Sequence, residues 1–318
     1  MPEVVLVDVF TLSPLSGNPA CVVLGAEELE EGQKSRIAVE LNQPETVFAS
    51  ASGDGVRLEF YTRGREVEIC GHGVVAAGWL LAKQSGMTKV STKAQELEVW
   101  REGDRVFVTY KKPAFSPVRG DREVVAKVLG LESRDLAPGL PLEVVSVGLP
   151  QLMVPVASLD ALRRTSPDTR KLSLLCAHAG FESVHVFTQE TFDKECVGHA
   201  RHFAPYYHVD EDPVTGTGNA GMVSYLARHQ RIKIPEGKVR FFCEQGHFIG
   251  RPGMVVVEVS GKDGEVDRLS IGGSCTEVLR GVLELGGKKA AIKEEAAEAP
   301  SKRTTSASKS GAKSAKRK

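Results

Sequence analysis

The stretch EICGHGVVAAGWLLAKQ, residues 68–84, changes from a strand-like pattern to a helical one at Cys70-Gly71-His72-Gly73. The segment that follows, GVVAAGWLLA, is apolar on nearly every face of a helix, which is typical of a helix buried on all sides. Short β-branched or aromatic runs bounded by Gly, Pro, Asn or Asp occur along most of the chain and predict many strands. A buried helix among many strands indicates a curved sheet wrapped around a central helix.

This stretch has a counterpart, VTGTGNAGMVSYLARHQ, at residues 214–230. When the glycines are aligned, Cys70 matches Thr215 and His72 matches Thr217. A second short similarity links VDVFT (7–11) with VHVFT (184–188). Two similarities in the same order predict a duplicated architecture, with one curved sheet around one helix in each half. Regularly spaced βαβ units are missing from the sequence, which disfavours a doubly wound fold.

Periodicity gives the approximate position of each element. Helical patterns occur at 27–41, 73–86, 121–130, 157–164 and 217–230. The clearest strand-like runs are 4–10, 20–25, 56–62, 97–102, 105–112, 142–148, 151–157, 183–189, 239–246 and 254–260. The stretch KKPAFSPVRGD (111–121) contains two prolines and a glycine, so we expect the chain to cross between the halves there.

The end of the chain differs from the rest in composition. From Gly286 onward there is no aromatic residue and only a single Ile, so residues 286–318 are predicted to form a disordered basic tail. The remainder suggests two domains, an N-terminal half at 1–113 completed by 266–285, and a C-terminal half at 114–265. The tail carries seven Lys or Arg and no acid from Ser301 onward. It is interpreted either as a solvated extension or as a nucleic-acid contact or nuclear address.

The sequence also indicates a compartment. No run of about 18 apolar residues occurs, so no membrane span is expected. The N-terminus MPEVVLVDVF lacks the positively charged start of a signal peptide. The six cysteines contain no CxxC pair and are interpreted as reduced thiols. We therefore expect a cytoplasmic protein, and the basic tail leaves a nuclear location open.

The paired Gly-containing motifs have a chemical interpretation. A helix N-terminus has unpaired backbone N–H groups and a partial positive charge, and glycines allow an anion to approach that backbone closely. Two such termini, one from each half, would face each other across a cleft. The alternative is that each motif is only a tight turn between a strand and a helix.

Two carboxylates stand out beside these motifs. Glu45 in LNQPETVFAS follows Pro44 and precedes apolar residues. Desolvation would raise its pKa from about 4.3 toward neutrality, which suits proton transfer. A surface glutamate is the alternative. Asp212 in DEDPVTGTG precedes a proline, where a helix cap is an equally good interpretation.

One cluster has the composition of a metal site. Cys196, His199, His202 and His208 lie close together in the sequence, and the spacing of the first three would place them on one helical face. Helical pattern is poor after Ala200, so a surface loop is favoured and no metal is predicted. The sequence contains no GxxxxGK[ST], no plausible dinucleotide fingerprint and no GxSxG, which disfavours the corresponding nucleotide-binding and hydrolase classes.

Five segments resemble a known family when they are taken together and in order. They are VDVFTLSPLSGNPACVVL, LNQPETVF, CGHGVVAAGWLL, RHFAPYYHVDEDPVTGTG and EQGHFIGRPGMVVVEV. They look like the PhzF-like isomerases of phenazine biosynthesis, within the diaminopimelate epimerase superfamily, over residues 3–284. The resemblance implies an α+β fold of two pseudo-symmetric domains, each a barrel-like sheet around a central helix. It also implies a site in the cleft between them, a homodimer, and no metal or organic cofactor.

The resemblance further implies roles for single residues. Glu45 matches the proton-shuttling glutamate, His72 the histidine of the Gly-His motif, and Asp212 the aspartate of Asp-Pro-x-Thr-Gly; these three are the predicted catalytic residues. The predicted substrate-binding residues are Asn18, Cys70, Gly71, Gly73, Thr215, Gly216, Thr217 and Gly218. Gly73 replaces the family's usual alanine, which predicts a slightly wider pocket.

These observations favour an isomerase that shifts a proton within a small carboxylated metabolite by acid–base catalysis at Glu45. An epimerase or racemase would need a second base opposite Cys70, and Thr215 at that position is a poor base. A dehydratase that uses Cys70 and a hydroxyl remains an alternative. A non-catalytic regulatory or binding protein on the same fold is another, since fold alone does not fix function.

Overall fold

The N-terminal half closes into a barrel of eight strands, as the pairings among the described residues show. The order is β1 (Glu3–Val9), β2 (Asn18–Leu24), β3 (Thr46–Ser52), β4 (Gly55–Tyr61), β6 (Met87–Ser91), β7 (Glu96–Glu102), β8 (Arg105–Tyr110) and β17 (Glu265–Val282), which returns to β1. Only β2–β3 and β4–β6 are parallel among these pairs, and each is joined by a helix, α1 (Glu31–Leu41) or α2 (Gly71–Leu81). The two-residue β5 (Glu66–Val67) pairs with β4. The computed structural model describes residues 1–53, 55–63, 65–82, 86–118, 120–262 and 265–285, so the tail predicted at 286–318 lies outside it.

The C-terminal half repeats this topology. Its strands follow the order β9 (Ala114–Pro117), β10 (Glu143–Ser146), β11 (Pro150–Pro155), β12 (Ser183–Thr188), β13 (Cys196–Ala204), β15 (Lys238–Gln245), β16 (Gly253–Lys262) and again β17. The parallel pair β11–β12 is joined through α4 (Leu159–Arg164) and α5 (Thr169–Ala179), and the parallel pair β13–β15 through α6 (Gly216–Arg228). The remaining elements are α3 (Arg122–Val128), β14 (Val209–Asp212), and the short 3-10 helices η1 (Ser133–Asp135), η2 (Pro205–Tyr207) and η3 (His247–Ile249).

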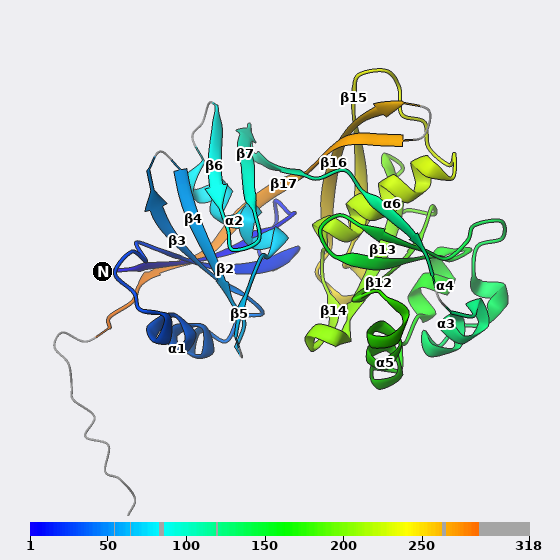
Figure 1. The fold of residues 1–318 in the computed structure, drawn as a ribbon, viewed down its shortest axis with the longest axis horizontal. Helices are drawn as coiled ribbons and strands as arrows, with labels where there is room; N and C mark the ends of the chain where they lie inside the picture. The colour runs from blue at the N-terminus through cyan, green and yellow to red at the C-terminus, as the bar shows by residue number, and fades with distance from the viewer. Residues whose placement is uncertain (54, 64, 83–85, 119, 263–264, 286–318) are drawn as a thin grey trace, which may run out of the picture. The chain divides into compact units, whose positions relative to one another are not determined.

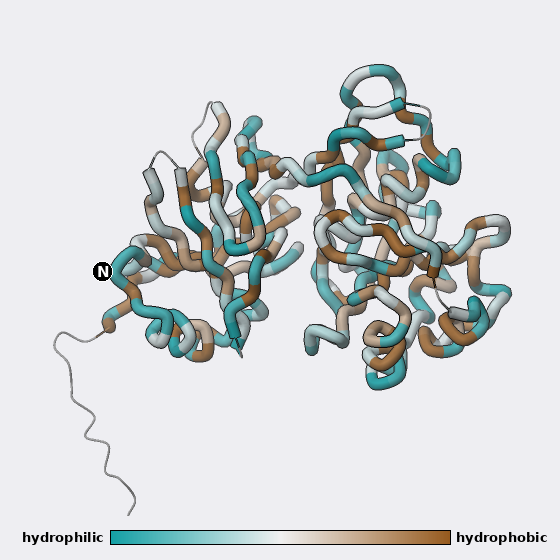
Figure 2. The backbone as a smooth tube through the Cα atoms, viewed as in Figure 1, coloured by the Kyte–Doolittle hydropathy of each residue, from teal (hydrophilic) through white to brown (hydrophobic). Residues whose placement is uncertain are grey.

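Each half has one central helix, as predicted. Helix α2 contacts β1, β2, β7 and β8, and α6 contacts β10, β11, β16 and β17 (Figure 1). The apolar side chains at the centre of α2 are enclosed, with Val74, Val75, Ala76 and Ala77 at most 1% exposed, whereas Trp79, Leu80 and Leu81 near its end are partly exposed. Figure 2 shows hydrophobic segments running through the strands of both halves. The α+β fold of two barrel-like sheets around central helices is therefore confirmed.

The longest strand, β17, belongs to both halves. Residues 269–274 pair with β8, residues 275–282 pair with β1, and the first part of the strand pairs with β16. Residues Met1–Glu284 accordingly form one compact unit. The boundaries at 1–113, 114–265 and 266–285 stay a prediction, although β9 already lies within the predicted crossing at 111–121 and pairs with β10.

The repeat is real, but only one of the two sequence similarities reflects it. Helices α2 and α6 occupy equivalent places in the two halves, which confirms the pairing of residues 68–84 with 214–230. The similarity between 7–11 and 184–188 is coincidental, because β1 corresponds to β10 whereas β12 corresponds to β3. A closer counterpart to GNPACVV (17–23) is GLPQLMV (148–154), since these segments form β2 and β11.

Other sequence predictions were wrong. Helix α5 was not predicted, although Asp168 caps its start and Gly180 adopts a left-handed conformation at its end. The segment with Cys196, His199 and His202, expected to be a surface loop or a helical face, is the largely buried strand β13, whose alternation turns His199 away from His202. In the described part of the chain, no helix is long and apolar enough to span a membrane.

Candidate active site

The loop before β3 and the start of α2 bring three predicted residues together. Oε2 of Glu45 lies 3.4 Å from Nε2 of His72. Nδ1 of His72 lies 3.5 Å from the sulfur of Cys70, the residue that precedes the helix. The Glu45 side chain is 21% exposed and that of His72 is 10% exposed. The carboxyl and the imidazole therefore form a nearly enclosed acid–base pair.

The charges in this group depend on one another. Burial alone would raise the pKa of Glu45, but the hydrogen bond and positive charge of His72 hold that pKa below its usual range. Burial alone would lower the pKa of His72, but the neighbouring Cys70 and Glu45 raise it well above its usual value. Burial raises the pKa of the Cys70 thiol, and the positive charge of His72 acts in the opposite direction. The expected rise in the Glu45 pKa is thus wrong, because His72 outweighs desolvation.

Asp212 enters from the other half, at the end of β14. Its Oδ1 accepts a hydrogen bond from Nδ2 of Asn18 at 2.8 Å, and its Oδ2 accepts one from Oγ1 of Thr215 at 2.5 Å. Burial raises the pKa of Asp212; the charge of Glu45 raises it further, whereas His72, Thr215 and Asn18 act in the opposite direction. The charges of Glu45 and His72 act on the Asp212 carboxyl, so this carboxyl lies near the acid–base pair.

A buried glutamine holds this aspartate and its threonine. Nε2 of Gln245 donates to the backbone oxygen of Asp212 at 2.8 Å, and Oε1 accepts from the backbone N–H of Thr215 at 3.0 Å. Nδ2 of Asn219 also donates to Oε1 at 2.8 Å. The Thr215 hydroxyl is already bonded to Asp212, so its evident role is to position that carboxyl.

The starts of α2 and α6 meet, as the paired glycine motifs predicted. Neither helix has a side-chain cap at its N-terminus. A methyl group placed on Gly71 would lie 4.0 Å from Cγ2 of Thr217 and 3.0 Å from the hydroxyl oxygen of Tyr110. The first-turn N–H groups of Gly71 to Gly73 and of Gly216 to Gly218 therefore lie in one region, where an anion could accept hydrogen bonds from both helices.

Besides Gln245, sequence reasoning missed two further side chains of this region. Tyr110 lies at the end of β8 beside Gly71. No pattern in the sequence marks this residue, and only the folded structure shows that it reaches the site. Gln151 on β11 is 2% exposed and donates through Nε2 to Oγ1 of Thr217 at 2.9 Å. The internal repeat offered a signal for Gln151, because it follows the Gly-x-Pro that matches Gly17-Asn18-Pro19.

Two glycines of the motifs are explained by packing. A Cβ on Gly73 would lie 2.8 Å from Cγ2 of Val47 and 3.2 Å from Cε1 of Phe60. Gly73 therefore faces packed core side chains, and the prediction that it widens the pocket is wrong. A Cβ on Gly218 would lie 2.5 Å from Nδ1 of His185, so this glycine lets α6 start close to a buried histidine.

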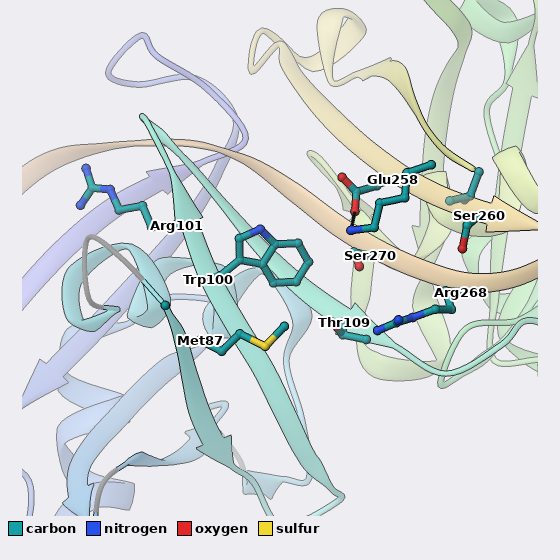
Figure 3. A pocket seen from close by; sticks show the side chains of 11 residues that line it. Met87, Trp100, Arg101, Thr109, Glu258, Ser260, Arg268 and Ser270 are labelled. Carbon is teal, nitrogen blue, oxygen red and sulfur yellow. Dashed lines mark hydrogen bonds and ion pairs between the residues drawn. The ribbon is translucent and has the colours of Figure 1, made fainter. Parts of the chain in front are cut away.

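The acid–base group has the donor atoms of a possible metal site, and a separate pocket lies away from it. Donor atoms of Glu45, Cys70 and His72 lie within 4.8 Å of one another, so the acid–base group itself could bind a metal ion. A pocket of roughly 300 Å³ opens between β6, β7, β16 and β17, and Figure 3 shows Trp100, Met87 and Arg268 at its wall. None of the predicted site residues lines it, and its lining offers no acid–base group comparable to the Glu45–His72 pair.

The two barrel-like sheets around central helices form a diaminopimelate epimerase-like fold. A probable proline racemase from Agrobacterium radiobacter K84 shares the fold, with a TM-score of 0.58 and 10% identity over 90% of this chain and 94% of that one. The chain belongs to the phenazine biosynthesis-like (PhzC-PhzF) family, whose profile matches residues 7–281. The resemblance inferred from the five sequence segments is therefore confirmed.

Relatives within the family are named isomerases. The uncharacterized isomerase YfhB of Bacillus subtilis is 34% identical over 276 residues, covering 83% of this chain and 92% of the relative. The trans-2,3-dihydro-3-hydroxyanthranilate isomerase of Pseudomonas fluorescens is 27% identical over 296 residues, covering 90% and 100%. The crystal structure of the Bacillus anthracis PhzF-family protein has a TM-score of 0.80 and 30% identity, covering 89% and 99%.

Proposed function

We propose that this protein is an isomerase that moves a proton between two carbons of a small carboxylated metabolite, with Glu45 as the shuttle. The observation that carries the proposal is the enclosed Glu45–His72 pair beside two facing, uncapped helix N-termini. The lowered pKa of Glu45 keeps its carboxyl group ionised, so this group can accept a proton. The isomerase names of its relatives support the reaction class.

In the proposed reaction the substrate carboxylate accepts hydrogen bonds from the N–H groups of Gly71 to Gly73 and Gly216 to Gly218. The C–H bond breaks, its electrons enter the system conjugated with the carboxylate, and Glu45 takes the proton. The N–H groups and the protonated His72 stabilise the negative charge that develops. Glu45 then returns the proton to another carbon, so the reaction needs no net oxidant or reductant.

The remaining residues position these groups. Asn18 and Thr215 donate hydrogen bonds to the two oxygens of Asp212 and fix its carboxyl beside the acid–base pair. Gln151 donates to the Thr217 oxygen, which leaves the Thr217 hydroxyl proton free for the substrate. A two-base racemase is disfavoured, because burial raises the pKa of the Cys70 thiol and the Thr215 hydroxyl is bonded to Asp212.

The remaining features of the proposal are a homodimer, a cytoplasmic location and chemistry without a metal or organic cofactor. The test is incubation of the protein with a panel of small unsaturated and hydroxylated carboxylic acids in deuterated water. The panel includes trans-2,3-dihydro-3-hydroxyanthranilate, the compound in the name of the Pseudomonas fluorescens relative. Deuterium at carbon together with a shifted double bond supports the proposal. Exchange at a stereocentre with inversion alone would favour an epimerase instead.

A further inference from the structure

Three side chains that the proposed mechanism does not use lie together in the C-terminal half. They are His199 on β13, Glu244 on β15 and His247 in η3, and one donor atom of each lies within 4.8 Å of the others. His199 and Glu244 are directly opposite in the parallel pair β13–β15. Gln245, the next residue along β15, points the other way and holds the Asp212 network. The cluster is therefore separate from the candidate active site.

Glu244 orients His199. The Glu244 carboxylate is 2% exposed, and Oε1 lies 2.8 Å from Nδ1 of His199. The same carboxylate accepts hydrogen bonds from the backbone N–H groups of Phe192 and Asp193 at 2.6 and 3.1 Å. Because Nδ1 of His199 carries the proton in its hydrogen bond to Glu244, Nε2 of the same ring has a free lone pair. Carboxylates orient metal-binding histidines in this way.

Two histidine nitrogens in the cluster are buried without a partner. Nε2 of His199 and Nδ1 of His247 make no hydrogen bond with any group in the described part of the chain. The two rings have centroids 4.8 Å apart, and His199 is fully buried. Buried polar atoms are nearly always paired. Two adjacent lone pairs of this kind are best explained by a third group that both can bind.

The surroundings provide an apolar wall and an access path. The ring of Phe192 lies 5.1 Å from that of His199 and 5.0 Å from that of His247, and Phe248 lies 5.1 Å from His199. A cavity of roughly 790 Å³ beside His247 is lined by Phe192, Phe248 and the three arginines Arg163, Arg164 and Arg201. An ion bound by the histidines would thus reach solvent on a side that carries positive charge, which favours water or a small anion as its remaining ligands.

We propose that His199 and His247 bind one divalent metal ion of the zinc class, with Glu244 holding His199 in the binding tautomer. Imidazole nitrogen suits Zn²⁺ and its neighbours among the transition metals, whereas Mg²⁺ and Ca²⁺ prefer oxygen ligands. Two protein nitrogens are fewer than the four ligands of a closed structural zinc site. The ion is therefore exchangeable, and its remaining positions are open to the cavity.

The test is a competition titration of the full-length, metal-free protein with ZnCl₂ against a chromophoric zinc chelator. His199→Asn keeps an amide N–H for Glu244 while it removes the Nε2 ligand, and His247→Ala removes the other nitrogen at a partly exposed position. Each substitution should weaken the binding of one zinc ion at least about tenfold. His208→Asn, at an exposed histidine outside the cluster, is the matched control and should leave binding unchanged.

Binding at Glu45, Cys70 and His72 must be separated from binding at this cluster. Cobalt(II) distinguishes them, because a cysteine ligand adds a thiolate-to-metal charge-transfer band and the His199–His247 cluster does not. The titrations are therefore run in a Cys70→Ala background as well. Zinc affinity that is the same in the parent, His199→Asn and His247→Ala proteins, or no saturable binding in the Cys70→Ala background, would overturn the proposal. Melting curves of each variant confirm that it is folded.

Discussion

Replacing Gly218 with alanine should destabilise the protein through one identifiable clash. The added Cβ would lie 2.5 Å from Nδ1 and 2.8 Å from Cε1 of His185, and 3.1 Å from Nδ1 of His202. Both histidines are buried, and their Nδ1 atoms are 3.2 Å apart, so neither ring has room to retreat. Overpacking of this kind costs about 1–3 kcal/mol, and a lost hydrogen bond adds about 1 kcal/mol. Alanine has a higher helix propensity than glycine, which offsets at most about 1 kcal/mol of this destabilisation.

The net expectation is a free energy of unfolding lower by about 1–3 kcal/mol, measured by urea denaturation at neutral pH. Gly32→Ala is the matched control, because Gly32 lies in α1 and a Cβ there meets nothing within 4 Å. That variant should be more stable than the parent by up to about 1 kcal/mol. If Gly218→Ala is as stable as Gly32→Ala, the packing of His185 and His202 beneath α6 is not as tight as described.

Three further outcomes are expected. Burial lowers the pKa of His202 to about 3, so the unfolded chain, in which histidine titrates near 6.5, binds more protons between those two values. The contribution of His202 to the free energy of unfolding should therefore fall by about 2 kcal/mol between pH 7 and pH 5, and His202→Gln should lessen that fall. If the pH dependence of His202→Gln equals that of the parent, the lowered pKa of His202 is contradicted. Cys70→Ala should lower turnover by about tenfold or less, because its thiol is not the proposed base; a dead variant in a steady-state assay would favour the epimerase or dehydratase alternatives. Deleting residues 286–318 should leave the melting temperature unchanged, because Met1–Glu284 form a compact unit on their own; a loss of several degrees would refute this.

The sequence predicted the architecture well where chemistry and periodicity agreed. GVVAAGWLLA could only be a buried helix, and the matching glycine motif in α6 indicated the repeat. The sequence assigned residues 266–285 to the N-terminal half but did not show that β17 is one continuous strand shared by both halves, because its residues alternate weakly and include two consecutive glycines, Gly272 and Gly273, which meet the rings of Phe107 and Phe10. Helix α5 was overlooked although its cap residues, Asp168 and Gly180, were visible in the sequence.

The sequence pointed to side chains that the structure brings together, but not to how their charges influence one another. Family resemblance supplied Glu45, His72 and Asp212, and the structure brings them together. The direction of the Glu45 pKa could not be foreseen, because it depends on a 3.4 Å contact with a histidine 27 positions further along the chain. Gln245 and Tyr110 come from distant strands, so only the fold shows that they reach the site.

The most direct test of the central claim is solvent deuterium incorporation by Glu45→Gln beside the parent and Cys70→Ala proteins, on the first carboxylic acid found to exchange. We predict that Glu45→Gln loses about 10²-fold or more of the exchange rate while its melting temperature stays close to that of the parent. Cys70→Ala should retain most of the exchange. If Glu45→Gln exchanges within about threefold of the parent, Glu45 is not the proton shuttle and the proposed mechanism is contradicted.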